Sequence, residues 1–311
     1  MCPKSGAKLA LAMALYKGQP YLPARSLDCA RPFPVEVLGP GIDDLRTINH
    51  WPSCLAALVQ KYRQYYRQNY CLLPLNHSLE AEAYGIQVYH DRYLGDRLDP
   101  QSKRQLDHGP LGALPLTDNA LAASLAACQR LSQRGEKICF NLTGPFTLAE
   151  QLYDFNDLLG CARRQPASYQ AVMAPLVQGL TRLGQAALDA GASVLALSDP
   201  TGDRELLGPR HYGQVAGGLQ RDLVERLLPS VEARGAKLYL SPGLYRGLAA
   251  LGWLERGPQL APAQDFPQLL FRETWSAKGL VTGSLQGGIY KLNPINKQEK
   301  GDSNDRNDDI R

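Results

Sequence analysis

Two stretches of the chain, GEKICFNLTGPFTLAEQL (135–152) and AGASVLALSDPTG (190–202), decide the fold. In each stretch a short apolar run rich in strand formers stops at small and polar residues. The segment between them, 166–190, has helical periodicity and ends at Gly191. This order of strand, helix and strand predicts a βαβ unit whose two strands carry their polar ends to the same side of a parallel sheet.

Length and composition are those of a globular α/β protein. The chain has 311 residues, of which 44% are hydrophobic and 21% charged, enough for one α/β barrel or two ordinary domains. A single domain is the simpler interpretation. The formal net charge is only +4, and the lysines and arginines are scattered rather than clustered. We therefore expect no nucleic-acid partner.

Cysteine usage and hydropathy point to the cytoplasm. The seven cysteines are an odd number, contain no CxxC pair and follow no secretory signal, so we expect reduced thiols. The longest apolar stretch near the start, 9–16, is too short to span a bilayer, and the 9–17 segment is predicted to be an amphipathic helix. We therefore expect no association with a membrane.

The two stretches also carry a family resemblance. The run Gly144-Pro145-Phe146-Thr147-Leu148-Ala149, followed later by Ser198-Asp199-Pro200-Thr201-Gly202, resembles the uroporphyrinogen decarboxylase (URO-D) superfamily. Within it, the motifs are most similar to the methylcobamide:coenzyme M and related corrinoid methyltransferases. The resemblance implies a TIM-type (β/α) barrel, expected as a single domain over residues 1–295. The C-terminal end of this chain departs from the family, so the barrel is expected to be incomplete or irregular there, and the composition of 296–311 predicts a polar disordered tail.

Candidate site residues begin after the apolar run 71–75, in the loop NHSLEAEAYG (76–85). His77 could act as a general base near neutral pH or, with Glu80 and Glu82, form part of a mixed nitrogen and oxygen metal site. The alternative is that these residues only cap a helix N-terminus. The resemblance also implies that decarboxylases keep an aspartate near the position of His77, so its replacement counts against a decarboxylase.

Further candidates lie at the ends of the next two predicted strands. Asn141 and Thr143 could bind a substrate carboxylate, carbonyl or phosphate, or could serve ordinary turn chemistry. Asp199, at a strand end and followed by proline, is expected to face the pocket, with an N-cap role as the alternative. The expected catalytic residues are thus His77, Glu82 and Asp199, and the expected substrate-binding residues are Glu80, Asn141, Thr143, Phe146 and Ser198.

The resemblance fails at the zinc ligands of the thiol-activating methyltransferases. Those enzymes are expected to keep a His-x-Cys pair after the fifth strand and a second cysteine late in the chain. Here the corresponding run is LYLSPG (238–243), and no cysteine occurs after Cys161. We therefore expect no zinc and no tightly bound cofactor in this chain. Any cobalamin would be carried by a partner protein.

The C-terminal part is predicted to depart from a regular barrel. The sequence predicts a short helix over 249–256, a strand over 258–262, a helix over 266–278 and a glycine-rich strand and loop over 279–288. The residues after Tyr290 are too few for an eighth strand with its helix. Earlier in the chain, a hairpin is predicted over 87–98.

Three functions from different classes remain open. The favoured one is a corrinoid-linked methyltransferase that moves a methyl group between a small substrate and a cobalamin protein. The alternatives are a uroporphyrinogen decarboxylase of porphyrin biosynthesis and a non-catalytic homologue that binds a ligand or partner. The expected partners are a small molecule and a corrinoid protein, and the expected state is a monomer or a homodimer.

Overall fold

A computed structural model describes residues 48–66, 68–91, 95–109, 111–261, 279–284 and 288–295. The helices predicted over 9–17 and 266–278 and the tail predicted over 296–311 lie outside the described residues. Within the described part, no helix combines the length and the apolar character needed to cross a membrane.

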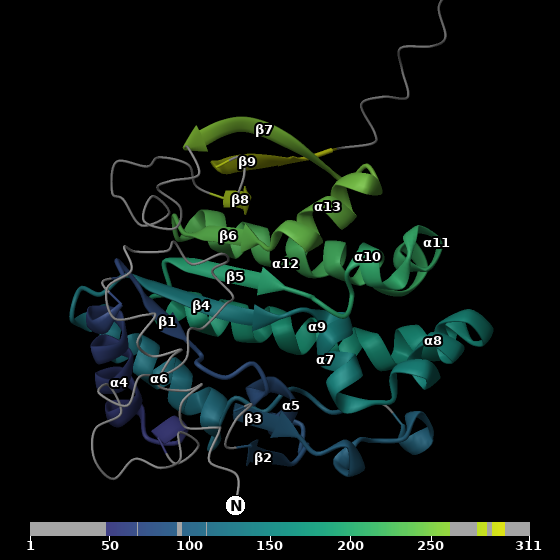
Figure 1. Ribbon diagram of the computed structural model, residues 1–311, viewed down its shortest axis with the longest axis horizontal. Helices are drawn as coiled ribbons and strands as arrows, with labels where there is room; N and C mark the ends of the chain where they lie inside the picture. Colours follow the sequence, from purple (N-terminus) through teal and green to yellow (C-terminus); the bar gives the residue numbers. More distant parts are fainter. Residues whose placement is uncertain are drawn as a thin grey trace, which may run out of the picture.

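The centre of the molecule is a seven-stranded sheet with the order β1-β4-β5-β6-β8-β9-β7 (Figure 1). The strands from β1 to β8 in this order pair in parallel, whereas β9 pairs antiparallel with both β8 and β7. In the described residues, β1 and β7 are the two ends of this order. The bounds are β1 Cys71–Leu73, β4 Ile138–Thr143, β5 Val194–Ser198, β6 Lys237–Leu240, β7 Leu254–Ala261, β8 Gly279–Ser284 and β9 Gly288–Pro294.

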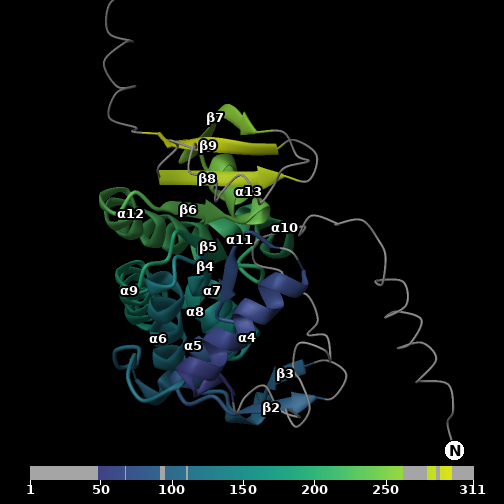
Figure 2. The same cartoon turned by 90° about the vertical axis from the view of Figure 1, so that its left-hand side faces the viewer.

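Helices cover one face of this sheet. Helices α4, α6, α9 and α12 pack on the parallel strands and on one another, and α6, α9 and α12 lie together on one side in Figure 2. Shorter helices come after the carboxyl ends of β1, β4, β5 and β6. The bounds are α4 Pro52–Tyr65, α5 Leu79–Ala83, α6 Ala120–Gln133, α7 Pro145–Leu152, α8 Phe155–Arg164, α9 Pro166–Asp189, α10 Arg204–Leu207, α11 Pro209–Tyr212, a π-helical turn Gly213–Gly217, α12 Gly218–Ala233 and α13 Pro242–Ala250.

The predicted βαβ unit is confirmed. Strand β4 and strand β5 are adjacent and parallel, with Cys139 opposite Val194 and Thr143 opposite Ser198, and α9 connects them. The predicted hairpin is also present, as β2 Val88–Asp91 and β3 Gly95–Leu98. A mostly parallel sheet with helical crossovers is the α/β architecture that the sequence predicts.

The parallel strands of the sheet divide their side chains between two apolar clusters. Alternate residues of β4, such as Phe140 and Leu142, pack against the helices in the large core. The residues between them face the other side, which we call the inner face. Its apolar members are Tyr70, Leu72, Cys139, Val194, Ala196, Tyr239 and Val281, with Leu260 packed against them.

The C-terminal part differs from the prediction. The helix predicted over 249–256 is wrong, because α13 already begins at Pro242 and ends at Ala250. Gly252, with a φ of 70°, then turns the chain in a conformation that other residues rarely adopt, and β7 comes next. Strand β9 adds a second antiparallel strand where the sequence predicts no further strand.

Candidate functional site

The carboxyl ends of β1, β4 and β5 lie side by side. The Gly144 amide donates to the Ser198 carbonyl oxygen at 2.7 Å, which extends the ladder between β4 and β5 beyond its last paired residues. On the other side, the Thr143 hydroxyl donates to the His77 carbonyl oxygen at 3.5 Å. The loops after these three strands are therefore neighbours, as in other parallel sheets.

Glu80 is a buried carboxyl group at this edge. Its side chain comes from α5, is 1% exposed, and accepts a hydrogen bond from the Thr143 amide through Oε1 at 3.1 Å. Its other oxygen, Oε2, is buried and has no hydrogen-bond partner in the described part of the chain. Burial raises the pKa of Glu80, and the hydrogen bonds from Thr143 oppose this only in part. The group is thus biased toward the protonated form, in which one oxygen can donate.

Asn141 is a second buried group with unused hydrogen-bonding capacity. Its neighbours on β4, Phe140 and Leu142, pack against the helices, and successive side chains of a strand point to opposite faces, so Asn141 lies on the inner face. It is 3% exposed, and neither Nδ2 nor Oδ1 has a partner among the residues described. In the sheet register Asn141 lies opposite Ala196 on β5, and Ala196 lies opposite Tyr239 on β6. The small side chain of Ala196 therefore separates the Asn141 amide from the Tyr239 phenol. An unpaired buried amide is uncommon and calls for an explanation.

The other two candidates of the first loop do not join this pair. The His77 side chain is exposed, and its carbonyl oxygen accepts from the Thr143 hydroxyl and from Gln151 Nε2, the latter at 3.3 Å. Glu82 is partly exposed and lies 4.0 Å from His50 Nε2. The structure therefore brings Glu80 to Thr143, two positions after Asn141 on β4, and leaves His77 exposed and Glu82 partly exposed.

Asp199 has a different position from the expected one. Ser198 pairs with Thr143 on the inner face, so Asp199 turns to the helix side of the sheet. There its carboxylate accepts from the amides of Thr147 at 2.7 Å and Phe146 at 3.4 Å, at the start of α7. Gln220 Nε2 donates to the same group at 2.8 Å. The expectation that Asp199 faces a pocket together with Asn141 is therefore corrected.

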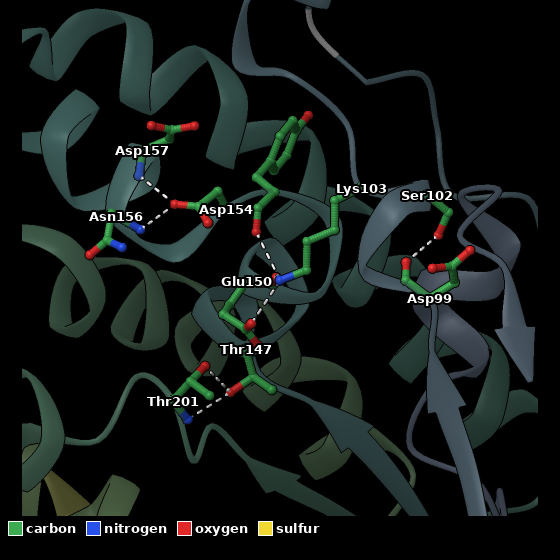
Figure 3. A network of polar contacts seen from close by, with 10 residues as sticks. Asp99, Ser102, Lys103, Thr147, Glu150, Asp154, Asn156, Asp157 and Thr201 are labelled. Atoms are coloured by element: carbon green, nitrogen blue, oxygen red, sulfur yellow. Dashed lines mark hydrogen bonds and ion pairs between the residues drawn. The ribbon is translucent and has the colours of Figure 1, made fainter. Parts of the chain in front are cut away.

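The surroundings of Asp199 form a network that fixes the start of α7. Gln220, from α12, also donates to the Gly202 carbonyl oxygen at 2.9 Å and accepts from the Tyr212 hydroxyl at 2.6 Å. Thr147 accepts from the Thr201 amide at 3.1 Å (Figure 3). Burial raises the pKa of Asp199, and the hydrogen bonds from Thr147 and Gln220 oppose this. All these partners belong to the protein, so the network holds two loops together.

Phe146 lies beside the Asp199 network. It is fully buried, and its ring meets that of Phe155 edge to face at 6.0 Å between centroids. Its amide donates to Asp199. Ser198 is partly buried, and its carbonyl accepts from Gly144. Of these two expected substrate-binding residues, Ser198 is on the inner face and Phe146 is in the apolar core.

Potential metal ligands do not cluster in the part of the chain that the structure describes. No group of three or more His, Cys, Asp or Glu side chains has the arrangement of a metal site there. At the carboxyl end of β6, where the resemblance implies zinc ligands, the chain has Ser241, Pro242 and Gly243. These residues offer no thiolate or imidazole, so the donor set does not fit zinc.

Two residues near the site are not among those predicted from the sequence. Gln220 lies among the apolar positions of α12, and a single polar residue in a helix gives no signal of a partner at the end of β5. Tyr239 lies in the short apolar run of β6, where its alternation with Leu238 and Leu240 was a usable signal for the inner face.

Comparison with known proteins agrees with this fold. A methyltransferase from Methanosarcina mazei superposes with a TM-score of 0.58 at 17% sequence identity, over 74% of this chain and 68% of that one. At this identity the likeness concerns the fold. No curated protein sequence matches the chain. The family model for uroporphyrinogen decarboxylase (URO-D) matches residues 44–233, which include β1, β4, β5 and their loops. The chain therefore belongs to the uroporphyrinogen decarboxylase family.

Proposed function

We propose that this protein is a methyltransferase of the URO-D family that moves a methyl group between a heteroatom of a small substrate and a cobalamin carried by a partner protein. The observation that carries the proposal is Glu80, a buried carboxyl group with one oxygen free at the carboxyl edge of the parallel sheet. Its position agrees with the usual place of active sites in parallel α/β sheets. The methyltransferase fold of the Methanosarcina neighbour supports the reaction class.

Methyl transfer from a heteroatom needs a proton at the leaving group. The corrinoid of the partner, when bound, supplies the electron pair that takes the methyl carbon. The bond between carbon and the heteroatom breaks, and its electron pair stays on the heteroatom. Glu80 in its protonated form gives a proton from Oε2 to that atom and is then reprotonated from solvent. Because burial raises the pKa of Glu80, the acid form persists to higher pH than in an exposed glutamate.

Neighbouring groups support this role. Thr143 holds the other oxygen of Glu80 through its backbone amide, so the carboxyl group has a fixed orientation. Asn141, two positions earlier on β4, offers an unpaired amide that can bind a polar part of the substrate. The absence of thiolate and imidazole at Ser241 to Gly243 favours a reaction without a zinc-bound thiolate.

The test is an anaerobic assay with reduced cobalamin and a panel of methylated amines, ethers and thioethers. Formation of methylcobalamin is measured by absorbance. We expect Glu80→Gln to lower the rate about 100-fold, because removal of a general acid has effects of this order. Glu82→Gln is the matched control, since it changes the same residue type on the same short helix at a partly exposed position. It should retain the wild-type rate.

Two results would contradict the proposal. Equal losses in Glu80→Gln and Glu82→Gln would remove Glu80 from the reaction. Conversion of uroporphyrinogen, measured by coproporphyrinogen formation, in a protein that forms no methylcobalamin with any of the methyl donors would identify a decarboxylase instead.

A further inference from the structure

A group of polar side chains lies outside the candidate site, between the ends of α5 and α7 and the middle of α9. Arg104 reaches this place because its amide donates to the Leu152 carbonyl oxygen at 2.7 Å and its backbone forms a parallel bridge with Tyr153. Tyr84 arrives from the end of α5. Its hydroxyl lies so close to Gly179 of α9 that a Cβ built there would be 2.9 Å away. The glycine thus leaves the room that the phenol needs.

The polar atoms of this group are buried without partners. By hydrogen-bond geometry the buried hydroxyls of Tyr84 and Tyr153 and the buried Nε of Arg104 have no partner among the residues described, although the Arg104 guanidinium lies near enough to the Tyr153 hydroxyl to interact with it. Tyr153 is only 1% exposed. None of the ion pairs in the described part of the chain includes Arg104 or Arg182, an exposed arginine one turn beyond Gly179 on α9. Buried polar groups and charges normally have partners, so this group lacks one.

These four residues lie near enough to one another to interact electrostatically. The hydroxyl of Tyr153 interacts with the guanidinium of Arg104, and Tyr84 interacts with both Tyr153 and Arg182. Burial raises the pKa of Tyr84 to about 12, and burial likewise raises the pKa of Tyr153. Both phenols therefore keep their protons at neutral pH. Phenol hydroxyls and guanidinium groups can then all donate, and two of the residues carry positive charge.

We propose that Tyr84, Arg104, Tyr153 and Arg182 bind an oxyanion, a carboxylate or a phosphate group of a small ligand. Such a group supplies both the acceptors and the negative charge that this site lacks, and arginine is well suited to bind either of them. The proposal does not depend on the methyltransferase function, because the site is built from different residues.

Lys103 is part of the scaffold rather than of the site. Its ammonium group donates to the Glu150 carbonyl oxygen at 2.6 Å, to Glu150 Oε1 at 2.9 Å and to the Tyr153 carbonyl oxygen at 3.2 Å (Figure 3). It therefore satisfies carbonyls at the end of α7 and holds the 103–104 segment against that helix. This anchoring keeps Arg104 beside Tyr153 before any ligand arrives.

The experiment measures oxyanion binding by the full chain. Inorganic phosphate and acetate are titrated by calorimetry and by thermal melting, with sodium chloride at matched ionic strength as the reference. We expect phosphate, acetate or both to raise the melting temperature above the chloride reference. Arg104→Gln should weaken binding at least 10-fold. Tyr153→Phe keeps the ring and should also weaken binding, without lowering the melting temperature in chloride, because the lost hydroxyl has no partner among the described residues.

Arg164→Gln provides the matched control. Arg164 lies on α8 and lines a cleft of about 690 Å³ with Gln105, Asp157 and Ser168, and the lining residues of this cleft include none of the four proposed ligands of the oxyanion. The Arg164→Gln variant should bind the oxyanion as the wild type does. The proposal is wrong if neither anion binds more strongly than chloride, if Arg104→Gln and Tyr153→Phe bind normally, or if Arg164→Gln loses binding equally. A lower melting temperature of Tyr153→Phe in chloride would assign the hydroxyl a structural role instead.

Discussion

The ends of β1 and β5 each lead to a buried carboxyl group, and the surroundings of the two groups are opposite. Asp199, after β5, accepts from two amides of α7 and from Gln220. Glu80, after β1, accepts from one amide and keeps Oε2 without a partner among the described residues. A carboxylate whose acceptors are filled by the protein stabilises the architecture, whereas one with a free oxygen remains available for a ligand.

The largest effect that tests this contrast is expected from Asp199→Ala. The change removes the acceptor for the Phe146 and Thr147 amides and for Gln220, and these groups stay buried. We expect the free energy of unfolding to fall by about 3 kcal/mol, since hydrogen bonds to charged groups contribute about 1.5–3 kcal/mol each and are not additive. Urea denaturation monitored by circular dichroism measures it. A loss below about 1 kcal/mol would contradict the structural role.

Gly144→Ala is expected to have the next largest effect. A Cβ at this position would lie 2.2 Å from the Asp199 Cβ, and the Asp199 backbone leaves little room to move. Because overpacking of a buried site costs about 1–3 kcal/mol, we expect a loss of about 2 kcal/mol. Gly112→Ala is the matched control, since nothing lies within 4 Å of a Cβ built there. Equal stability of the two variants in urea would show that the loop after β4, with Gly144, and the loop after β5, with Asp199, do not approach so closely.

A smaller effect is expected from Tyr212→Phe. The change removes the hydroxyl that donates to Gln220 and leaves the ring in place. A typical hydrogen bond contributes about 1 kcal/mol, so the midpoint of urea unfolding should shift accordingly. Glu80 is held by the Thr143 amide and not by this network, so the proton transfer proposed for Glu80 should be unchanged in this variant.

Glu80→Gln should have the smallest effect on stability. At pH 4.5 we expect a change within about 0.5 kcal/mol, because the amide still accepts from Thr143. The pH dependence is the sharper measurement. The folded pKa of Glu80 is above its ordinary value of 4.5, so the folded state holds more protons than the unfolded state and stability falls as the pH rises from 4.5 to the folded pKa.

In Glu80→Gln the fall in stability with rising pH that Glu80 causes, at most about 1.4 kcal/mol per pH unit, should be absent. The contribution of Asp199, whose pKa is also raised, has the same sign and should persist. Urea unfolding at several pH values measures both slopes. Identical slopes in the wild type and in Glu80→Gln would show that burial does not raise the pKa of Glu80.

The sequence predicts the parallel core well because strand and helix signals are local. The run before Asn141, the helix ending at Gly191 and the run before Ser198 give β4, α9 and β5 in the right order. The side of the sheet to which Asp199 turns was not predictable in this way. Strand β5 is apolar on both faces, so its hydrophobic pattern has no alternation that sets the orientation of the next residue.

The remaining features depend on contacts between distant segments. Asp199 caps a helix that begins more than 50 residues earlier in the chain, and no local motif announces such a cap. The Tyr84, Arg104 and Tyr153 group unites three separate segments, each of which is ordinary by itself. Glu80 and Asn141 were predicted as candidates because they come after or within apolar runs, but their unpaired atoms are a property of the folded chain.

The antiparallel strands at the edge of the sheet have a consequence for synthesis. Strand β7 precedes β8 and β9 in the chain, yet in the described residues its ladder is formed with β9, which also pairs with β8. In a chain emerging from the ribosome, β7 therefore lacks its β9 partner until the segment 288–294 has also emerged. The parallel core can assemble before that moment, whereas this edge is completed only when β9 inserts between its two neighbours.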